Sequence, residues 1–486
     1  MTSKEVFDII ASQFSVEPTN DQKLVVERLS EFLIRFREPS FFVLKGYAGT
    51  GKTTVVGAFV RALRNFNLRS VLLAPTGRAS KILAGYSGQK AFTIHKKIYR
   101  SHVDEFGGFR TKLNKNMHRN TIFIVDEASM IPDINLSSET SMFAVRSLLE
   151  DLVNYVNSGV NCKLILVGDT AQLPPVGLDA SPALDLEFLK HTFDCEIFSE
   201  EMREVVRQSQ DSGVLYNATM LRIKLATDDF SLPLFDTNDY TDIKKINGSE
   251  LEDTLNDAYS KYSSDEIAII TRSNKRANLF NQEVRNRLLF REESLSGGDL
   301  MMTLKNNYFW LPETSDIGFI ANGDMLEIQR IRGFEKMYGF QFANVSLQLK
   351  DYPDEPNLEV KLLLNTIDLE SPALSYQDSM RLWNEVSKDY EHIPNKRKRF
   401  AEIKQNPYLN ALQVKFAYAL TAHKTQGGQW KAVFIDQGYF TEDMLNAEFL
   451  RWMYTAITRA TECVYLVNFA DNFFVPSSRA PRPRSG

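Results

Sequence analysis

The sequence predicts an α/β fold of two lobes, each built around a parallel sheet. Short apolar runs alternate with amphipathic stretches in the first 200 residues, and the runs are 41–44, 70–74, 122–125 and 164–167. The C-terminal half repeats the pattern at 267–270, 417–420, 433–435 and 464–467. Strands of a parallel sheet are buried on both faces, so they read as continuous apolar runs. The length of 486 residues also exceeds the usual ~100–200 residues of one domain.

Composition and charge narrow the class of protein. Hydrophobic residues make up 43% and charged residues 24%, which is typical of a folded globular enzyme. The net charge is −5, so contact with nucleic acid would need a local basic groove. Cys162, Cys195 and Cys463 are far apart and form no C-x-x-C pair, which disfavours a disulfide scaffold or a zinc site. With neither a signal peptide nor a membrane span evident, we expect a cytoplasmic protein.

Two stretches depart from the α/β pattern and are interpreted as insertions. Residues 94–120 are polar and basic, and Phe106 to Phe109 (FGGF) has the composition of a hairpin tip. Residues 325–410 begin with β-like runs and continue into a charged, helical region. The first lobe is therefore expected at 1–93 and 121–200, and the second at 201–324 and 411–475. The basic, Pro-rich tail 476–486 is expected to be disordered.

A phosphate-binding loop stands between the first apolar run and the helix that follows it. GYAGTGKT at 46–53 matches G-x-x-x-x-G-K-[ST]. The glycines let backbone N–H groups wrap phosphates, and the following helix directs its positive end at them. In this site Lys52 would neutralise phosphate charge, and the hydroxyl of Thr53 would bind Mg²⁺.

A pair of carboxylates follows another apolar run about seventy residues later. Asp126 and Glu127 come directly after TIFIV, which is the arrangement expected of a Walker B site. Such a pair is weak evidence for this kind of site on its own, because carboxylates at the end of a strand are often only exposed to solvent. With the phosphate loop upstream, the pattern favours Asp126 as a Mg²⁺ ligand and Glu127 as the catalytic base.

Eight motifs in order resemble those of superfamily 1 helicases, especially the RecD-like and Dda-like branch. They are GYAGTGKT (46–53), APTGRAS (74–80), TIH (93–95), VDEASM (125–130), GDTAQLPPVG (168–177), MREVVRQS (202–209), ALTAHKTQGGQW (419–430) and MYTAITRA (453–460). The resemblance implies two RecA-like domains and 5′-to-3′ travel on single-stranded DNA. It also implies that 94–120 carries a pin hairpin and 325–410 an SH3-like domain with an added arm.

The resemblance assigns further residues to ATP. Gln22 would read adenine, Gln172 would sense the γ-phosphate, and Arg207 and Arg459 would reach that phosphate from the second lobe. Catalysis would then depend on Lys52, Glu127, Gln172, Arg207 and Arg459. Binding of ATP would involve Gln22, Gly46, Ala48, Gly49, Thr50, Gly51, Lys52, Thr53, Thr54, Gln426 and Gly427.

The same resemblance assigns residues to DNA. They are Pro75, Thr76, Arg78, Thr93 and His95 in the first lobe, and Asn274, His423 and Thr425 in the second, with Gln426 beside them. Phe106 and Phe109 would form the tip of the pin that splits the duplex, because an aromatic ring can stack on a separating base pair. The alternative for His95 and His423 is a structural role, because a lone histidine is more often a hydrogen-bonded structural residue. The run KRKR at 396–399 could touch a DNA backbone, but such a run more often forms a solvated helix face.

We therefore expect an ATP- and Mg²⁺-dependent DNA helicase of replication, recombination or repair. Its partners would be single-stranded and forked DNA, together with replication or single-strand-binding proteins, and the chain would act as a monomer. One alternative is an RNA helicase of the same superfamily, since phosphate contacts and stacking suit either nucleic acid. Another is a single-strand translocase that displaces proteins without separating strands. A plain P-loop kinase would need neither the second lobe nor the paired TIH and TAHKTQGG motifs.

Overall fold

A computed structural model describes residues 2–35, 39–103, 109–133, 147–205, 211–238, 240–311, 315, 317 and 319–476. The chain divides into two compact units. The first contains residues 1–170, 174–204 and 281–418, and the second contains 171–173, 205–280 and 419–486.

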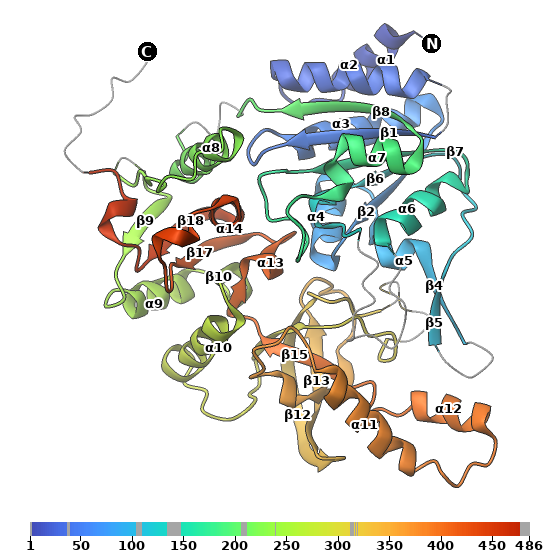
Figure 1. The fold of residues 1–486 in the computed structure, drawn as a ribbon, viewed down its shortest axis with the longest axis vertical. Coiled ribbons are helices and arrows are strands. Elements are labelled where there is room, and N and C mark those ends of the chain that lie inside the picture. The colour runs from blue at the N-terminus through green and yellow to red at the C-terminus, as the bar shows by residue number, and fades with distance from the viewer. Residues whose placement is uncertain are drawn as a thin grey trace. The chain divides into compact units, whose positions relative to one another are not determined.

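A six-stranded parallel sheet is the centre of the first unit (Figure 1). Its order is β3-β2-β6-β7-β1-β8. The strands are β1 (Ser40–Gly46), β2 (Arg69–Ala74), β3 (Ala91–Thr93), β6 (Arg119–Val125), β7 (Val160–Gly168) and β8 (Glu196–Met202). The helices are α1 (Ser3–Ala11), α2 (Asn20–Ile34), α3 (Lys52–Ala62), α4 (Gly77–Ser87), α5 (Ile94–Ile98), α6 (Leu148–Asn157) and α7 (Leu186–Phe193).

Each face of this sheet has its own hydrophobic core, because side chains alternate along a strand. In β1, Phe41 and Val43 face a core that includes residues of α6, whereas Phe42 and Leu44 face a core that includes residues of α2 and α3. Burial on both faces explains why the strands appear in the sequence as unbroken apolar runs.

A closed five-stranded barrel also belongs to the first unit. Its strands are β11 (Leu300–Thr303), β12 (Met325–Met337), β13 (Phe340–Leu349), β14 (Leu358–Leu363) and β15 (Leu412–Phe416). The barrel begins at Leu300, 25 residues before the insertion expected at 325, because β11 pairs with both β12 and β15 and closes the ring. Between β14 and β15 lie α11 (Tyr376–Lys388) and α12 (Lys396–Lys404), and both helices contribute to an apolar cluster with β13.

The second unit contains a five-stranded parallel sheet of order β16-β10-β17-β18-β9. The strands are β9 (Ile243–Ile246), β10 (Ile267–Thr271), β16 (Ala419–Thr421), β17 (Trp430–Asp436) and β18 (Ala460–Val467). The helices are α8 (Gly213–Ala226), α9 (Leu251–Lys261), α10 (Asn274–Glu283), α13 (Ala422–Thr425) and α14 (Ala447–Ile457). Two parallel sheets in two units confirm the predicted fold class.

A short antiparallel pair of strands lies where the first insertion is expected. Strands β4 (Tyr99–Val103) and β5 (Phe109–Leu113) pair antiparallel within the stretch 94–120, and residues 104–108 between them lie outside the described residues.

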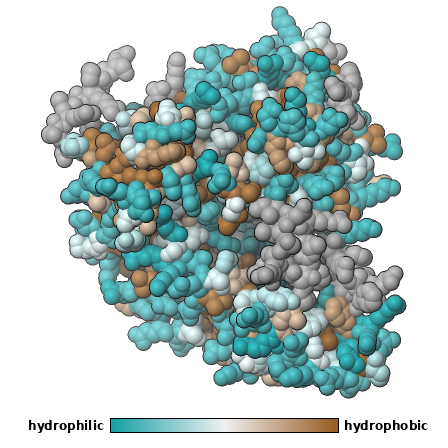
Figure 2. All heavy atoms as spheres, viewed as in Figure 1, coloured by the Kyte–Doolittle hydropathy of each residue, from teal (hydrophilic) through white to brown (hydrophobic). Residues whose placement is uncertain are grey.

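On the face shown in Figure 2, apolar residues form small groups within a largely hydrophilic surface. In the part of the chain that the structure describes, no helix is long and apolar enough to cross a membrane. The three cysteines are buried, and none of them forms a disulfide.

Candidate ATP and nucleic-acid sites

The phosphate loop lies at the carboxyl end of β1, between that strand and α3. Gly49 and Gly51 have φ angles of 77° and 84°, which glycine adopts without the strain that a side chain would add. Gly51 precedes the first residue of α3, so no side chain caps the N–H groups at this helix end. Backbone donors at a helix N-terminus attract anions.

The side chain of Lys52 folds back over the loop. Its ammonium donates to the carbonyl oxygens of Gly46 at 2.5 Å and Tyr47 at 3.0 Å. A Cβ atom on Gly46 would lie 2.9 Å from Cγ of Lys52, so glycine leaves the room that this side chain needs. The arrangement holds a positive charge where a phosphate could take over as its partner.

Gln22 is buried and already uses both ends of its amide. Its Oε1 accepts from the backbone N–H of Thr19 at 3.0 Å, and its Nε2 donates to the carbonyl of Thr50 at 3.3 Å. The first bond belongs to the capping box of α2, and the second joins that helix to the phosphate loop. A role in reading adenine therefore stays a prediction, since the amide would have to exchange these partners.

The carboxylates Asp126 and Glu127 follow β6 at the same sheet edge as the phosphate loop, because β1 and β6 are parallel and separated only by β7. Oδ1 of Asp126 accepts from the backbone N–H of Glu127 at 2.9 Å. Glu127 has a φ of 52°, a left-handed conformation that a side chain adopts at a cost.

Tyr86, at the C-terminal end of α4, was not singled out by the sequence. Its hydroxyl donates to Oδ2 of Asp126 at 2.6 Å. Burial, followed by the charge of Asp126, raises the pKa of Tyr86 well above its ordinary value, so the hydroxyl keeps its proton. No local pattern identifies such a residue, because the bond joins positions forty residues apart.

The residues at this edge fit a magnesium ion held together with phosphates. Asp126 offers a carboxylate, and the exposed Thr53 on the first turn of α3 offers a hydroxyl. Hard oxygen ligands of this kind suit Mg²⁺, which usually binds one or two carboxylates plus substrate phosphates. No group of three or more His, Cys, Asp or Glu side chains placed to hold a metal occurs among the described residues.

Three predicted ATP residues gather around α14 in the second unit. The backbone N–H of Leu173 donates to Oγ1 of Thr455 at 2.9 Å, and Nε2 of Gln426 donates to the carbonyl of Leu173 at 2.6 Å. Arg459 is buried and donates to the carbonyls of Thr455 at 3.0 Å and Gly428 at 3.2 Å. Oε1 of Gln172 is buried without a hydrogen-bond partner. Arg207 lies outside the described residues.

The remaining ATP residues lie in or beside the phosphate loop, or in a second glycine turn after α13. Ala48 and Thr54 flank the phosphate loop and the start of α3, and Gly427 adopts a φ of 71° after α13.

The predicted DNA residues of the first unit cluster at two helix starts. Thr76 caps α4 by accepting from the N–H of Ala79 at 3.2 Å, and Thr93 caps α5 by accepting from Lys96 at 3.3 Å. Pro75 and Arg78 flank the first of these caps. Burial lowers the pKa of His95, which favours a neutral ring.

In the second unit, the predicted DNA residues lie at the start of α10 and in α13. Asn274 begins α10, and the hydroxyl of Thr425 donates to the carbonyl of Ala422 at 2.8 Å. Burial lowers the pKa of His423, an effect that Glu448 partly opposes. Of the predicted pin residues, Phe109 begins β5 opposite Val103, whereas Phe106 lies outside the described residues.

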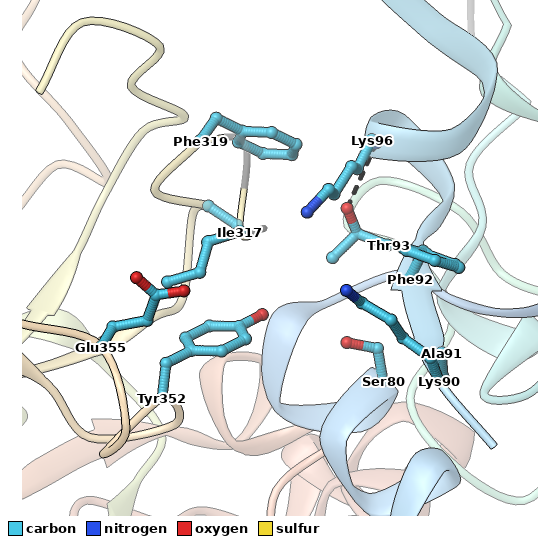
Figure 3. A pocket seen from close by; sticks show the side chains of 11 residues that line it. Ser80, Lys90, Ala91, Phe92, Thr93, Lys96, Ile317, Phe319, Tyr352 and Glu355 are labelled. Carbon is cyan, nitrogen blue, oxygen red and sulfur yellow. Dashed lines mark hydrogen bonds between the residues drawn. The ribbon is translucent and has the colours of Figure 1, made fainter. Parts of the chain in front are cut away.

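Thr93 also lines a cavity of about 110 Å³ within the first unit (Figure 3). The ammonium groups of Lys90 and Lys96 point into it from one side. Phe319 and Tyr352 face them from the connections between barrel strands, and Glu355 stands behind. Cations beside hydroxyls and an aromatic ring are the groups that bind the phosphates and bases of a single strand.

The phosphate loop, the carboxylates at the same sheet edge and the second parallel sheet define a P-loop nucleotide hydrolase with two RecA-like domains. Residues 33–224 match the family model described as an AAA domain, and residues 416–467 match that of the UvrD-like helicase C-terminal domain. These two matches, together with the relatives RecD2 and dda, support a superfamily 1 helicase of the RecD and Dda branch.

Individual relatives cover different parts of the chain. An uncharacterised protein of Acanthamoeba polyphaga mimivirus is 21% identical over 91% of this chain and 98% of its own length. The ATP-dependent RecD2 DNA helicase of Deinococcus radiodurans is 29% identical over 33% of this chain, and the ATP-dependent DNA helicase dda of Enterobacteria phage T4 is 31% identical over 32%. The matched parts make up 19% and 33% of those two helicases.

Among solved structures, a Pif1 helicase from Bacteroides in complex with ADP-AlF3 and single-stranded DNA covers 95% of this chain and 95% of its own. The TM-score is 0.44 and the sequence identity is 15%.

Proposed function

We propose that this protein is an ATP- and Mg²⁺-dependent DNA helicase that moves 5′ to 3′ along one strand and separates duplex DNA. The observation that carries the proposal is the phosphate loop beside Asp126 and Glu127 at one sheet edge, in a chain whose eight motifs follow the order of the superfamily. We further propose that it acts as a monomer inside the cell, in replication, recombination or repair, where single-strand-binding proteins would be its neighbours.

Hydrolysis would begin with the exchange of partners at the phosphate loop. The ammonium of Lys52 would leave the carbonyls of Gly46 and Tyr47 for the β- and γ-phosphates, while the N–H groups at the start of α3 hold the same oxygens. Glu127 would orient and deprotonate the attacking water. A bound Mg²⁺, held by Asp126 and Thr53, would neutralise charge that develops on the phosphates.

Residues of the second unit would detect the γ-phosphate. Arg459 would turn from the carbonyls of Thr455 and Gly428 to the phosphate, and Arg207 is proposed for the same task. Such arginines stabilise the transition state by ~10³–10⁵-fold. Gln172 would also respond, since the unpartnered Oε1 is an acceptor for the attacking water. These contacts would form only while the γ-phosphate is present. The conformation that they stabilise would therefore depend on bound ATP.

The strand would pass the caps of α4 and α5 and the cavity beside Thr93. Lys90 and Lys96 would hold phosphates there, and the ring of Phe319 would support a base. Pro75, Thr76, Arg78 and His95 would contact the strand in the first unit, and Asn274, His423 and Thr425 would do so in the second.

The test is strand separation on two forked duplexes whose single-stranded tails have opposite polarity. With ATP and Mg²⁺, we expect unwinding from the 5′ tail alone. Lys52→Ala and Glu127→Gln should abolish it, and both should leave binding to single-stranded DNA in place. Unwinding from the 3′ tail alone would overturn the proposed polarity.

The other candidate functions give different outcomes in the same assay. A translocase that displaces bound proteins would hydrolyse ATP on single strands and open neither fork. An RNA helicase would show ATP hydrolysis stimulated more by RNA than by DNA, because it would recognise the 2′-hydroxyl. Absence of stimulated hydrolysis with either nucleic acid would refute all three.

A further inference from the structure

Helix α4 joins two parts of the proposed machinery. Its N-terminal end carries Thr76 and Arg78, which are proposed to contact DNA, and its C-terminal end carries Tyr86, which donates to Asp126 at 2.6 Å. At 1.5 Å per residue, the ten steps from Thr76 to Tyr86 span ~15 Å. A helix of this length moves as a rigid rod, so a shift at one end reaches the other.

The position of Tyr86 is fixed by close packing between α4 and the helix that follows the phosphate loop. A Cβ atom added to Gly57 in α3 would lie 3.2 Å from the carbonyl oxygen of Tyr86, so the two backbones meet where α3 carries no side chain. The ring of Tyr86 packs against the core shared by α2 and α3. The hydroxyl is therefore aimed at Asp126 by elements that also hold the phosphate loop.

Asp126 receives a donor on each of its two oxygens. The N–H of Glu127 binds Oδ1 and the hydroxyl of Tyr86 binds Oδ2. The first donor belongs to the neighbouring residue and moves with the strand end, whereas the second comes from a separate helix. Tyr86 is thus the donor that can fix or change the orientation of the carboxylate independently of β6.

We infer that Tyr86 is a positioning residue for the magnesium site, and that it transmits a shift of α4 from bound DNA to Asp126. This inference rests on the proposed function. When a strand engages Thr76 and Arg78, the displaced helix would move the hydroxyl of Tyr86 and so reorient the carboxylate toward the nucleotide-bound ion. Groups that orient a metal ligand in this way typically change metal affinity or activity by ~10–100-fold.

The test compares Tyr86→Phe with Tyr99→Phe. Tyr99 provides a matched control, because its hydroxyl also donates to a buried carboxylate of the first unit, Oδ2 of Asp151, at 2.7 Å. Both variants keep the ring and lose one hydroxyl. The first readout is the Mg²⁺ concentration that half-saturates binding of a fluorescent ADP analogue, which needs no turnover. The second is the ratio of ATP hydrolysis with and without single-stranded DNA.

We expect Tyr86→Phe to need about tenfold more Mg²⁺ and to lose most of the stimulation by DNA, while Tyr99→Phe matches the wild type in both. An unchanged Mg²⁺ requirement would overturn the positioning role. A raised requirement with full stimulation would overturn the coupling through α4. If wild-type hydrolysis does not respond to DNA, the proposed function fails, and the binding measurement still decides the role of Tyr86 at the metal.

Discussion

A carboxyl group buried between the barrel and α4 makes the stability of the first unit depend on pH. Asp324, directly before β12, is 2% exposed. Its Oδ2 accepts from the N–H of Ala321 at 2.7 Å, and its Oδ1 has no hydrogen-bond partner. Burial, with a smaller effect of Asp351, raises its pKa to about 8, against an ordinary value of 3.8.

The sign of the pH dependence follows from which state holds the proton. Between these two pKa values the folded chain keeps a proton that the unfolded chain has released, so stability is present at low pH and lost as pH rises. The slope is about 1.4 kcal/mol per pH unit for one proton, and the whole window amounts to a loss on the order of 6 kcal/mol. Asp324→Asn cannot ionise and should remove this slope.

Amide hydrogen exchange in β12 and β13, measured by mass spectrometry from pH 5.5 to 8.5, gives the local free energy of opening. Comparing wild type with a variant at the same pH cancels the pH dependence of the intrinsic exchange rate. We expect wild type to lose protection relative to Asp324→Asn as pH rises, and Asp354→Asn, an exposed neighbour between β13 and β14, to follow wild type. Equal protection of wild type and Asp324→Asn across the range would refute the reasoning.

Two further predictions concern the same unit. Gly77→Ala would place a Cβ atom 2.4 Å from Oδ1 of Asp324, so we expect it to lower the free energy of unfolding by about 1–3 kcal/mol in urea titrations. Gly85→Ala, in the same helix with nothing within 4 Å, should be neutral or stabilising, and equal losses in both would exclude the clash. For binding to single-stranded DNA, the slope of log K against the logarithm of the salt concentration should become shallower by about 0.7 in Lys90→Ala. Lys4→Ala is its control, and an unchanged slope for Lys90→Ala would exclude a phosphate contact at the cavity.

The parallel sheets could be predicted because their signal is local. Strands buried on both faces must be apolar at every position, and the runs at 41–44, 122–125 and 267–270 all fall within observed strands. The phosphate loop could also be recognised from the sequence, because its glycines, Lys52 and the flanking strand and helix are contiguous in the chain. The structure confirms the predicted fold class, whereas the role of the loop in binding phosphate stays a prediction.

Features that depend on contacts distant in sequence could not be predicted. The start of the barrel at Leu300 is set by pairing with β15, more than a hundred residues later. The bond from Tyr86 to Asp126 and the cavity between β3 and the barrel arise in the same way, because tertiary packing decides which side chains meet. The predicted domain boundaries and site roles stay predictions, and the variants of Lys52 and Glu127 test two of those roles.

The left-handed backbone of Glu127 bears on attempts to engineer the protein. At a φ of 52°, a residue with a side chain costs roughly 1–2 kcal/mol, whereas glycine adopts the angle freely and asparagine tolerates it well. A laboratory selection for heat resistance would therefore reward Gly or Asn at position 127 and, with either, discard the proposed base. If thermostable variants from such a selection have lost turnover, codon 127 should be sequenced first. Loss of the Glu127 carboxylate would explain the inactivity without any decrease in the flexibility of the protein.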